Sequence, residues 1–206
     1  YPPSKIYIDI NFLETLSVEE IKSGIGEILH FYFFADSDLA EEMMSNYDEI
    51  LETPNLLQEY ILASLMIKKG IIEIDEFDKN ERNLFNYGHT FGHAIETLTR
   101  YKINHGQAVT MGMDIANYLS EKLGYMDRNT YKSMKVILSK NIPELDIGEY
   151  DLEKYFYALS RDKKNVGENL VCILSQGPGK LVKKQIAFDD GLKEMITSYF
   201  YNTHRN

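Results

Sequence analysis

The stretch Arg82-Asn-Leu-Phe-Asn86-Tyr-Gly-His89-Thr-Phe-Gly-His93-Ala-Ile-Glu96 decides how this chain is interpreted. Four polar side chains in it are spaced four, three and four residues apart: Arg82, Asn86, His89 and His93. On a single helix these side chains fall within roughly 40° of one another, with an apolar face behind them. Solvated helix faces are usually built from Glu and Lys, so this stripe predicts a functional site.

Composition limits what that site does. The chain has 206 residues, of which 44% are hydrophobic, enough for a substantial core. Its net charge of −10 argues against nucleic acid or an anionic membrane as a partner, and no apolar run reaches the ~20 residues of a membrane span. The single cysteine, Cys172, excludes an internal disulfide and fits a cytoplasmic, reducing compartment.

The sequence pattern predicts a mainly α-helical fold. The capping box Ser17-Val-Glu-Glu20 opens a helix to about residue 34. Further helices are expected over residues 37–52, 54–77, 82–101, 106–123, 127–140, 151–160 and 190–201. A strand is expected over residues 5–10, and Gln176-Gly-Pro-Gly179 predicts a β-hairpin over residues 170–186. No Gly-x-Gly-x-x-Gly motif follows a strand, so no nucleotide site is expected within this chain.

Two histidines and a glutamate are candidate metal ligands. His89 and His105 are neutral imidazoles from two elements, and Glu27 lies in a helix that is apolar nearly all round. A buried carboxylate needs a partner, and a divalent cation is a strong one. The alternative is that Glu27 pairs with an Arg or Lys and that the histidines are core residues. His93 is either a third ligand or a substrate-binding group.

Several cations could bind an anionic substrate. Lys68 lies on the preceding helix, and Arg82 offers a bidentate fork for a carboxylate or phosphate. Lys163 and Lys164 follow Asp162 at the end of a helix, where lysines commonly interact with the helix dipole instead. For Asp75 and Glu76 we favour structural pairing or capping over acid–base chemistry.

Taken together, these motifs resemble the 3-dehydroquinate synthases of the sugar-phosphate cyclase family. The resemblance extends from Tyr1 to about Gly179. It rests on Gly24-Ile-Gly-Glu27-Ile, Lys68 seven residues before Asp75-Glu76, the Arg82-to-Glu96 phrase, His105-Gly-Gln-Ala-Val109 and Asp162-Lys-Lys164.

The resemblance implies a two-domain enzyme of which residues 1–206 are the helical, metal-binding C-terminal domain. It implies Glu27, His89 and His105 as zinc ligands. It also implies a substrate site for a seven-carbon keto-acid phosphate, made by Lys68, Arg82, Asn86, His93 and a lysine of the 163–164 pair. NAD would belong to an N-terminal half absent from this chain, which begins Tyr1-Pro-Pro without an initiator Met, as a fragment or processed product would. The resemblance also implies a homodimer and a reaction in the shikimate pathway.

Two substitutions depart from the family pattern. His30 stands where the family has a substrate-site lysine, which predicts weaker anchoring of substrate, a closed four-ligand metal site or a buried core residue. Gln107 replaces the usual Glu. The alternatives are another cyclase such as a deoxyinosose or valiolone synthase, a metal-dependent polyol dehydrogenase, or a metal-binding module without turnover.

Overall fold

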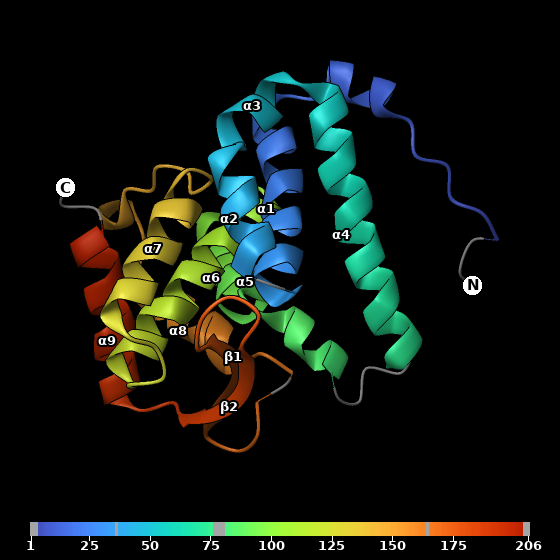
Figure 1. Cartoon of the computed structure of the whole chain (residues 1–206). Coiled ribbons are helices and arrows are strands. Elements are labelled where there is room, and N and C mark those ends of the chain that lie inside the picture. The colour runs from blue at the N-terminus through green and yellow to red at the C-terminus, as the bar shows by residue number, and fades with distance from the viewer. Residues whose placement is uncertain (1–3, 36, 76–80, 164, 204–206) are drawn as a thin grey trace.

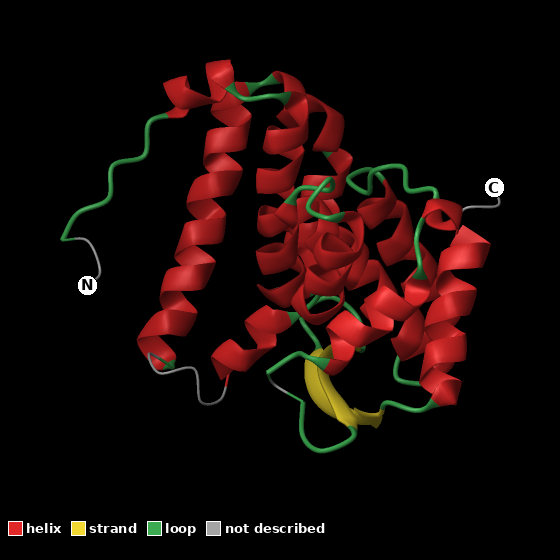
Figure 2. Cartoon of the chain, turned by 180° about the vertical axis from the view of Figure 1, so that it is seen from behind, coloured by secondary structure: helices red, strands yellow, loops and turns green. Residues whose placement is uncertain are grey.

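The structure, a computed structural model, describes residues 4–35, 37–75, 81–163 and 165–203. Helices make up most of this part of the chain and one β-hairpin lies at one end of the molecule (Figures 1 and 2). The predicted mainly α fold is therefore confirmed. Glu76 and Lys164 lie outside the described residues.

The N-terminal helices pack side by side (Figure 1). Helix α1, Val18–Ala35, begins at the predicted capping box, where the Ser17 and Glu20 side chains each accept a hydrogen bond from the other residue's backbone N–H. The helix expected over residues 37–52 is interrupted at Asn46, giving α2, Ser37–Ser45, and α3, Tyr47–Glu52. The amide of Asn46 donates to the Tyr60 hydroxyl at 2.9 Å, which ties this break to α4, Pro54–Ile74.

Helix α6, His105–Lys122, is the centre of the fold. It contacts α1, α5, α7, α9 and β1, and its residues are buried along almost its whole length (Figure 1). Its small and apolar side chains on all sides are typical of a fully enclosed helix. Some polar groups among them bond to residues outside the helix, as where the Tyr87 hydroxyl donates to the Asn117 side-chain oxygen at 2.6 Å.

The C-terminal part follows the predicted order. Helix α7 is Arg128–Ser139 and α8 is Leu152–Ser160, each with an aspartate N-cap and separated by the short 3₁₀ helix η3, Ile147–Glu149. Strands β1, Asn169–Ser175, and β2, Leu181–Ala187, pair antiparallel around the predicted turn. Helix α9, Asp190–Thr203, closes the chain against α6.

Two predicted elements are wrong. The segment expected as a strand over residues 5–10 is extended and exposed, and is followed by the 3₁₀ helix η1, Ile10–Thr15. Among the described residues the sheet contains β1 and β2 alone, so this segment has no strand to pair with. The helix expected over residues 82–101 is two elements: the 3₁₀ helix η2, Glu81–Asn86, and α5, His89–Thr99.

Candidate metal centre and substrate pockets

Three helices bring the predicted metal ligands together. Glu27 lies in the middle of α1, whereas His89 and His105 are the first residues of α5 and α6. Oε1 of Glu27 lies 3.1 Å from Nε2 of His105 and 3.7 Å from Nε2 of His89. Suitable ligand atoms of all three residues lie within 4.8 Å of one another. The structure therefore brings the three predicted residues together, while their role as ligands stays a prediction.

The second nitrogen of each histidine faces a hydrogen-bond acceptor. Nδ1 of His89 lies 3.2 Å from the backbone carbonyl oxygen of Tyr87, and Nδ1 of His105 lies 3.2 Å from Oε1 of Glu96. Because these partners accept, the network assigns the ring proton to Nδ1 in both residues. Neutral rings of this tautomer present Nε2 lone pairs toward Glu27.

This donor set fits a divalent cation. Oε1 of Glu27 is buried, and the ring nitrogens of His105 and His89 face it at 3.1 and 3.7 Å without a hydrogen bond of good geometry from any described residue. Facing lone pairs on these atoms repel one another, so either a ring proton or a bound cation has to lie between them. A two-histidine, one-carboxylate set is also one that zinc and similar metals bind while a coordination position stays open.

The three groups titrate as a unit. Burial alone would raise the pKa of Glu27, but the surrounding histidines outweigh it and lower that pKa to about 2. The polar contact with Glu27 raises the pKa of His105 to about 9, whereas burial lowers the pKa of His89 to about 4. Without a cation, His105 and Glu27 therefore form an ion pair at neutral pH, and metal binding has to displace the His105 proton.

The predicted single helical stripe is wrong, because Gly88 breaks it. Gly88 has a left-handed backbone, with φ of +78°, so the Arg82–Asn86 turn leaves the axis of α5. Asn86 and His93 nevertheless line one pocket of about 390 Å³, together with Thr90, Arg161 and Lys163. The side chain of Arg82 lies outside the described part of the structure.

His93 does not belong to the group of potential metal ligands that contains Glu27, His89 and His105. Its ring lies 5.6 Å from that of His89 and 5.8 Å from that of His105, measured between centroids, and its side chain is exposed. It forms a second possible ligand group with Glu96 and His105. This position next to the cluster and within the pocket favours a substrate contact over a third ligand.

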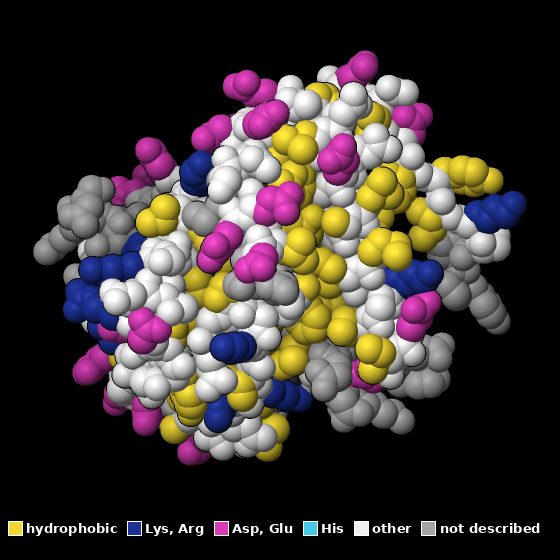
Figure 3. All heavy atoms as spheres, in the orientation of Figure 1, with side chains coloured by type: hydrophobic (Ala, Val, Ile, Leu, Met, Phe, Trp, Pro, Cys, Tyr) yellow, Lys and Arg dark blue, Asp and Glu magenta, His cyan; other side chains and the backbone are white. Residues whose placement is uncertain are grey.

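Lys68 approaches the cluster from another side. It is exposed on α4, with Nζ 5.7 Å from the centroid of the Phe31 ring. Lys68 and Glu27 line a mostly apolar groove of about 350 Å³ between α1 and α4. Hydrophobic side chains follow this part of the molecular face in Figure 3. Lys68 thus lies along the same groove as Glu27, one of the candidate metal ligands.

His30 is a buried residue beside the cluster. It is 1% exposed, and its ring centroid lies 4.9 Å from that of His89. Burial lowers the pKa of His30 to about 3 and outweighs the neighbouring Glu27 carboxylate. Among the described residues, His30 belongs to neither group of potential metal ligands. The burial favours a core role over substrate anchoring or a fourth ligand.

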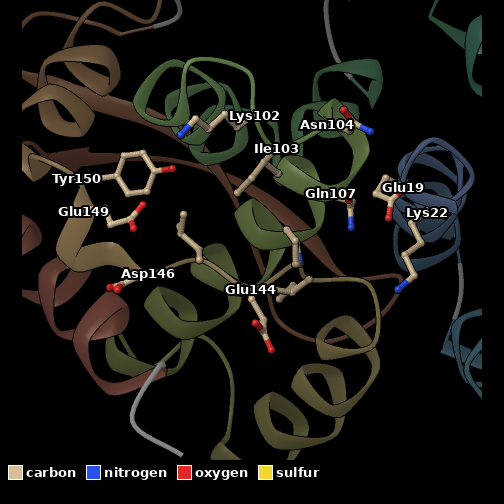
Figure 4. A pocket seen from close by; sticks show the side chains of 13 residues that line it. Glu19, Lys22, Lys102, Ile103, Asn104, Gln107, Glu144, Asp146, Glu149 and Tyr150 are labelled. Carbon is tan, nitrogen blue, oxygen red and sulfur yellow. The ribbon is translucent and has the colours of Figure 1, made fainter. Parts of the chain in front are cut away.

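A third pocket lies away from these residues. It has a volume of about 490 Å³ and mixed charge, with Lys22 and Lys102 facing several acids (Figure 4). Gln107 lines it and donates to the backbone carbonyl of Asn141 at 3.4 Å. The departure from the family pattern at Gln107 therefore concerns this pocket and is not part of the metal cluster.

Glu96, Thr90 and Arg161 were not assigned site roles from the sequence. Glu96 lies three residues after His93 and nine before His105, a relationship that becomes visible only when α5 and α6 pack. Thr90 is buried, and its hydroxyl has no hydrogen-bond partner among the residues that the structure describes. Cys172 is buried and free, as predicted, and burial raises the pKa of its thiol to about 12.

In the described part of the chain, every helix is too short or too polar to cross a membrane.

The fold and the cluster define a mainly helical domain with a candidate metal centre. The chain belongs to the 3-dehydroquinate synthase family, whose C-terminal domain matches residues 24–165. It is 34% identical to a 3-dehydroquinate synthase from Clostridium tetani over 201 residues, covering 96% of this chain and 53% of the relative. It is 31% identical to one from Alkaliphilus metalliredigens, covering 98% of the chain and 57% of the relative. The chain thus spans about half the length of these relatives.

Solved structures have the same fold at lower identity. A 2-deoxy-scyllo-inosose synthase, complexed with carbaglucose-6-phosphate, NAD⁺ and Co²⁺, matches with a TM-score of 0.80 and 23% identity, over 95% of this chain and 56% of that one. The 2-epi-5-epi-valiolone synthase from Streptomyces hygroscopicus, with NAD⁺ and Zn²⁺ bound, matches with a TM-score of 0.77 and 19% identity, over 97% and 55%. These similarities show the fold alone.

Proposed function

We propose that this chain is the metal- and substrate-binding half of a 3-dehydroquinate synthase, a lyase that eliminates phosphate from a seven-carbon keto-acid phosphate and closes the ring. The observation that carries the proposal is the Glu27–His89–His105 cluster beside a pocket lined by Asn86, His93 and Lys163. The family membership supports the same reaction. The chain covers only 53% of the Clostridium tetani relative, which supports a second half in the complete enzyme. We assign NAD binding to that half.

Each group has a distinct task in this proposal. Glu27, His89 and His105 hold a divalent cation, zinc by preference, which supplies Lewis acidity toward substrate oxygens. Lys163 and Arg82 bind the phosphate and carboxylate, and Asn86 donates or accepts hydrogen bonds with hydroxyls. His93 lies close enough to the metal ligands to exchange a proton with a substrate held in the pocket. Lys68 holds an anionic end along the α1–α4 groove.

Metal analysis tests the ligand assignment with this chain alone. We expect one divalent ion per chain, with large loss in His105→Ala and Glu27→Gln because each removes a donor atom. His93→Ala should retain most of the metal. Equal loss in His93→Ala and His105→Ala would make His93 a ligand and would contradict the assignment.

A complementation assay tests the reaction. This chain alone should not release phosphate from the seven-carbon substrate in the presence of NAD. Fused to the portion of the Clostridium tetani relative that precedes the matched region, it should do so. A fusion that binds metal and remains folded but has no turnover would favour a metal-binding module without catalysis.

A further inference from the structure

Glu96 and Glu27 hold the His105 ring from opposite nitrogens. Nδ1 of His105 lies 3.2 Å from Oε1 of Glu96, and Nε2 lies 3.1 Å from Oε1 of Glu27. The two carboxylates come from α5 and α1, whereas His105 begins α6. A metal bound to Nε2 can share only the carboxylate on that side of the ring, which is Glu27. The carboxylate of Glu96, on the Nδ1 side, therefore has a different task.

We propose that Glu96 is a positioning residue, which accepts the Nδ1 proton of His105 and so keeps Nε2 free for the metal. This inference rests on the metal centre proposed above. A carboxylate behind a ligating histidine fixes the ring tautomer and orientation and increases the basicity of the other nitrogen. The separation of 3.2 Å is within hydrogen-bond range.

The burial of Glu96 supports this assignment. Its side chain is 11% exposed, compared with 44% for His105. A carboxylate that is nearly removed from water is costly unless it is paired. Among the residues that the structure describes, the ion-pair partner found for this carboxylate is His105, not a lysine or arginine. The buried charge is therefore directed at a histidine whose orientation matters for the metal.

The backbone fixes Glu96 and His105 relative to each other. The Glu96 carbonyl accepts a hydrogen bond from the Tyr101 N–H at 2.8 Å, which closes the C-terminal turn of α5. Arg100 and Tyr101 both have left-handed backbones, with φ of 52° and 59°. Two consecutive non-glycine residues in this region are strained. This tight reversal leads from α5 to the first residue of α6 and places His105 beside Glu96.

A second ion is the competing explanation for the same carboxylate. Ligand atoms of His93, Glu96 and His105 also lie within 4.8 Å of one another. Nδ1 of His105 cannot both donate a proton to Glu96 and bind an ion, so the two arrangements exclude each other. The hydrogen-bond distance and the exposure of His93 favour the positioning role.

The test is a Zn²⁺ competition titration of the chain and its variants. We expect one ion per chain throughout and affinity roughly 10- to 100-fold lower in Glu96→Ala. Glu96→Gln should lose much less, because its amide oxygen still accepts the Nδ1 proton. Asp114→Asn is the matched control: it also neutralises a buried carboxylate, but one that contacts no metal ligand, and should leave the affinity unchanged.

Spectroscopy separates positioning from a folding defect. The visible spectrum of the Co²⁺-loaded chain should change in Glu96→Ala and recover in Glu96→Gln, while the far-ultraviolet circular dichroism of both metal-free variants matches the parent. Wild-type affinity in Glu96→Ala would overturn the inference. Two ions per chain, the second lost in both Glu96→Ala and His93→Ala, would overturn it in favour of a second site. No metal bound by the parent chain would instead overturn the proposed function.

Discussion

Gly26 and Gly106 bring the backbones of α1 and α6 into direct contact, each one residue from a candidate metal ligand. A methyl group on Gly26 would lie 2.1 Å from the carbonyl oxygen of Gly106, closer than any real contact. The backbone N–H of Gly106 also donates to the Ser23 hydroxyl at 3.0 Å. The two helices can approach this closely because neither residue has a side chain. Glu27 and His105 reach each other because of this approach.

Gly26→Ala should therefore damage both stability and the metal centre. The obstructing atoms belong to the backbone, so the helices must separate, which we expect to cost about 2 kcal/mol or more. Zinc affinity should fall in parallel, since Glu27 and His105 move apart. Gly24→Ala is the control on the same helix, because a methyl group there meets nothing within 4 Å and alanine favours helix. Urea unfolding and zinc titration of the two variants measure both effects; equal behaviour would contradict the role of the contact.

The replacement of His30 by an apolar residue should be tolerated. In the described part of the chain neither ring nitrogen of His30 has a hydrogen-bond partner of good geometry, although the Phe85 backbone is near enough to favour the protonated ring. Replacing an unsatisfied buried polar group by an apolar one of similar size is commonly neutral or stabilising. We expect the free energy of unfolding of His30→Leu to lie within about 1 kcal/mol of that of the parent, and its zinc affinity to be unchanged. A tenfold loss of zinc affinity without unfolding would show that His30 is a ligand after all.

Asp114 should make the stability of the chain depend on pH. It is fully buried, and burial raises its pKa to about 6 despite the attraction of Lys135 and the hydrogen bond from Tyr199. Aspartate in an unfolded chain titrates near ~4. Ionisation therefore opposes folding, and the penalty develops from about pH 4 and is complete above about pH 7.

Asp114→Asn should remove this penalty. The asparagine keeps an acceptor for the Tyr199 hydroxyl, which now donates to Oδ2 at 2.8 Å. We expect the variant to be more stable than the parent by about 3 kcal/mol at pH 8 and by only about 1 kcal/mol at pH 4.5. Urea unfolding at the two pH values measures the difference. A difference that does not change with pH would mean that folding leaves the pKa of the Asp114 carboxyl near its ordinary value.

The sequence predicted elements best where the determining signals were local. The capping box at Ser17, the helices that begin near Asp127 and Asp151 and the hairpin turn at residues 176–179 depend on neighbours along the chain, and all were predicted within a few residues. The break at Gly88 was missed because periodicity cannot reveal a glycine with positive φ inside a helical pattern. The strand expected near the N-terminus failed because strand formation needs a partner elsewhere in the fold.

The site shows the same division. Residue types and spacing were sufficient to predict Glu27, His89 and His105 as a cluster, although they lie on three elements. Glu96 was missed because its carboxylate faces His105 only through the packing of α5 on α6. The sequence could not decide whether His30 is buried or faces the substrate site. A helix that is apolar nearly all round does not define which of its faces is buried.

The pocket beside His93 should bind phosphate. Arg161 and Lys163 line it with one acidic residue, Asp162, and the buried Thr90 hydroxyl at its wall has no hydrogen-bond partner among the described residues. A phosphate oxygen can accept hydrogen bonds from Arg161, Lys163 and the Thr90 hydroxyl. Titration of the zinc-loaded chain with inorganic phosphate, followed by nuclear magnetic resonance, should shift the backbone signals of these residues at millimolar concentrations.

Lys163→Ala should weaken this phosphate binding at least about fivefold, or ~1 kcal/mol, because it removes one cation from the pocket. Lys154→Ala is the control of equal charge, since Lys154 is exposed on α8 and lines a different pocket. Binding should also weaken with added salt, as screening of exposed charges requires. Equal weakening by the two substitutions would show attraction to the general surface charge and would contradict a phosphate site beside His93.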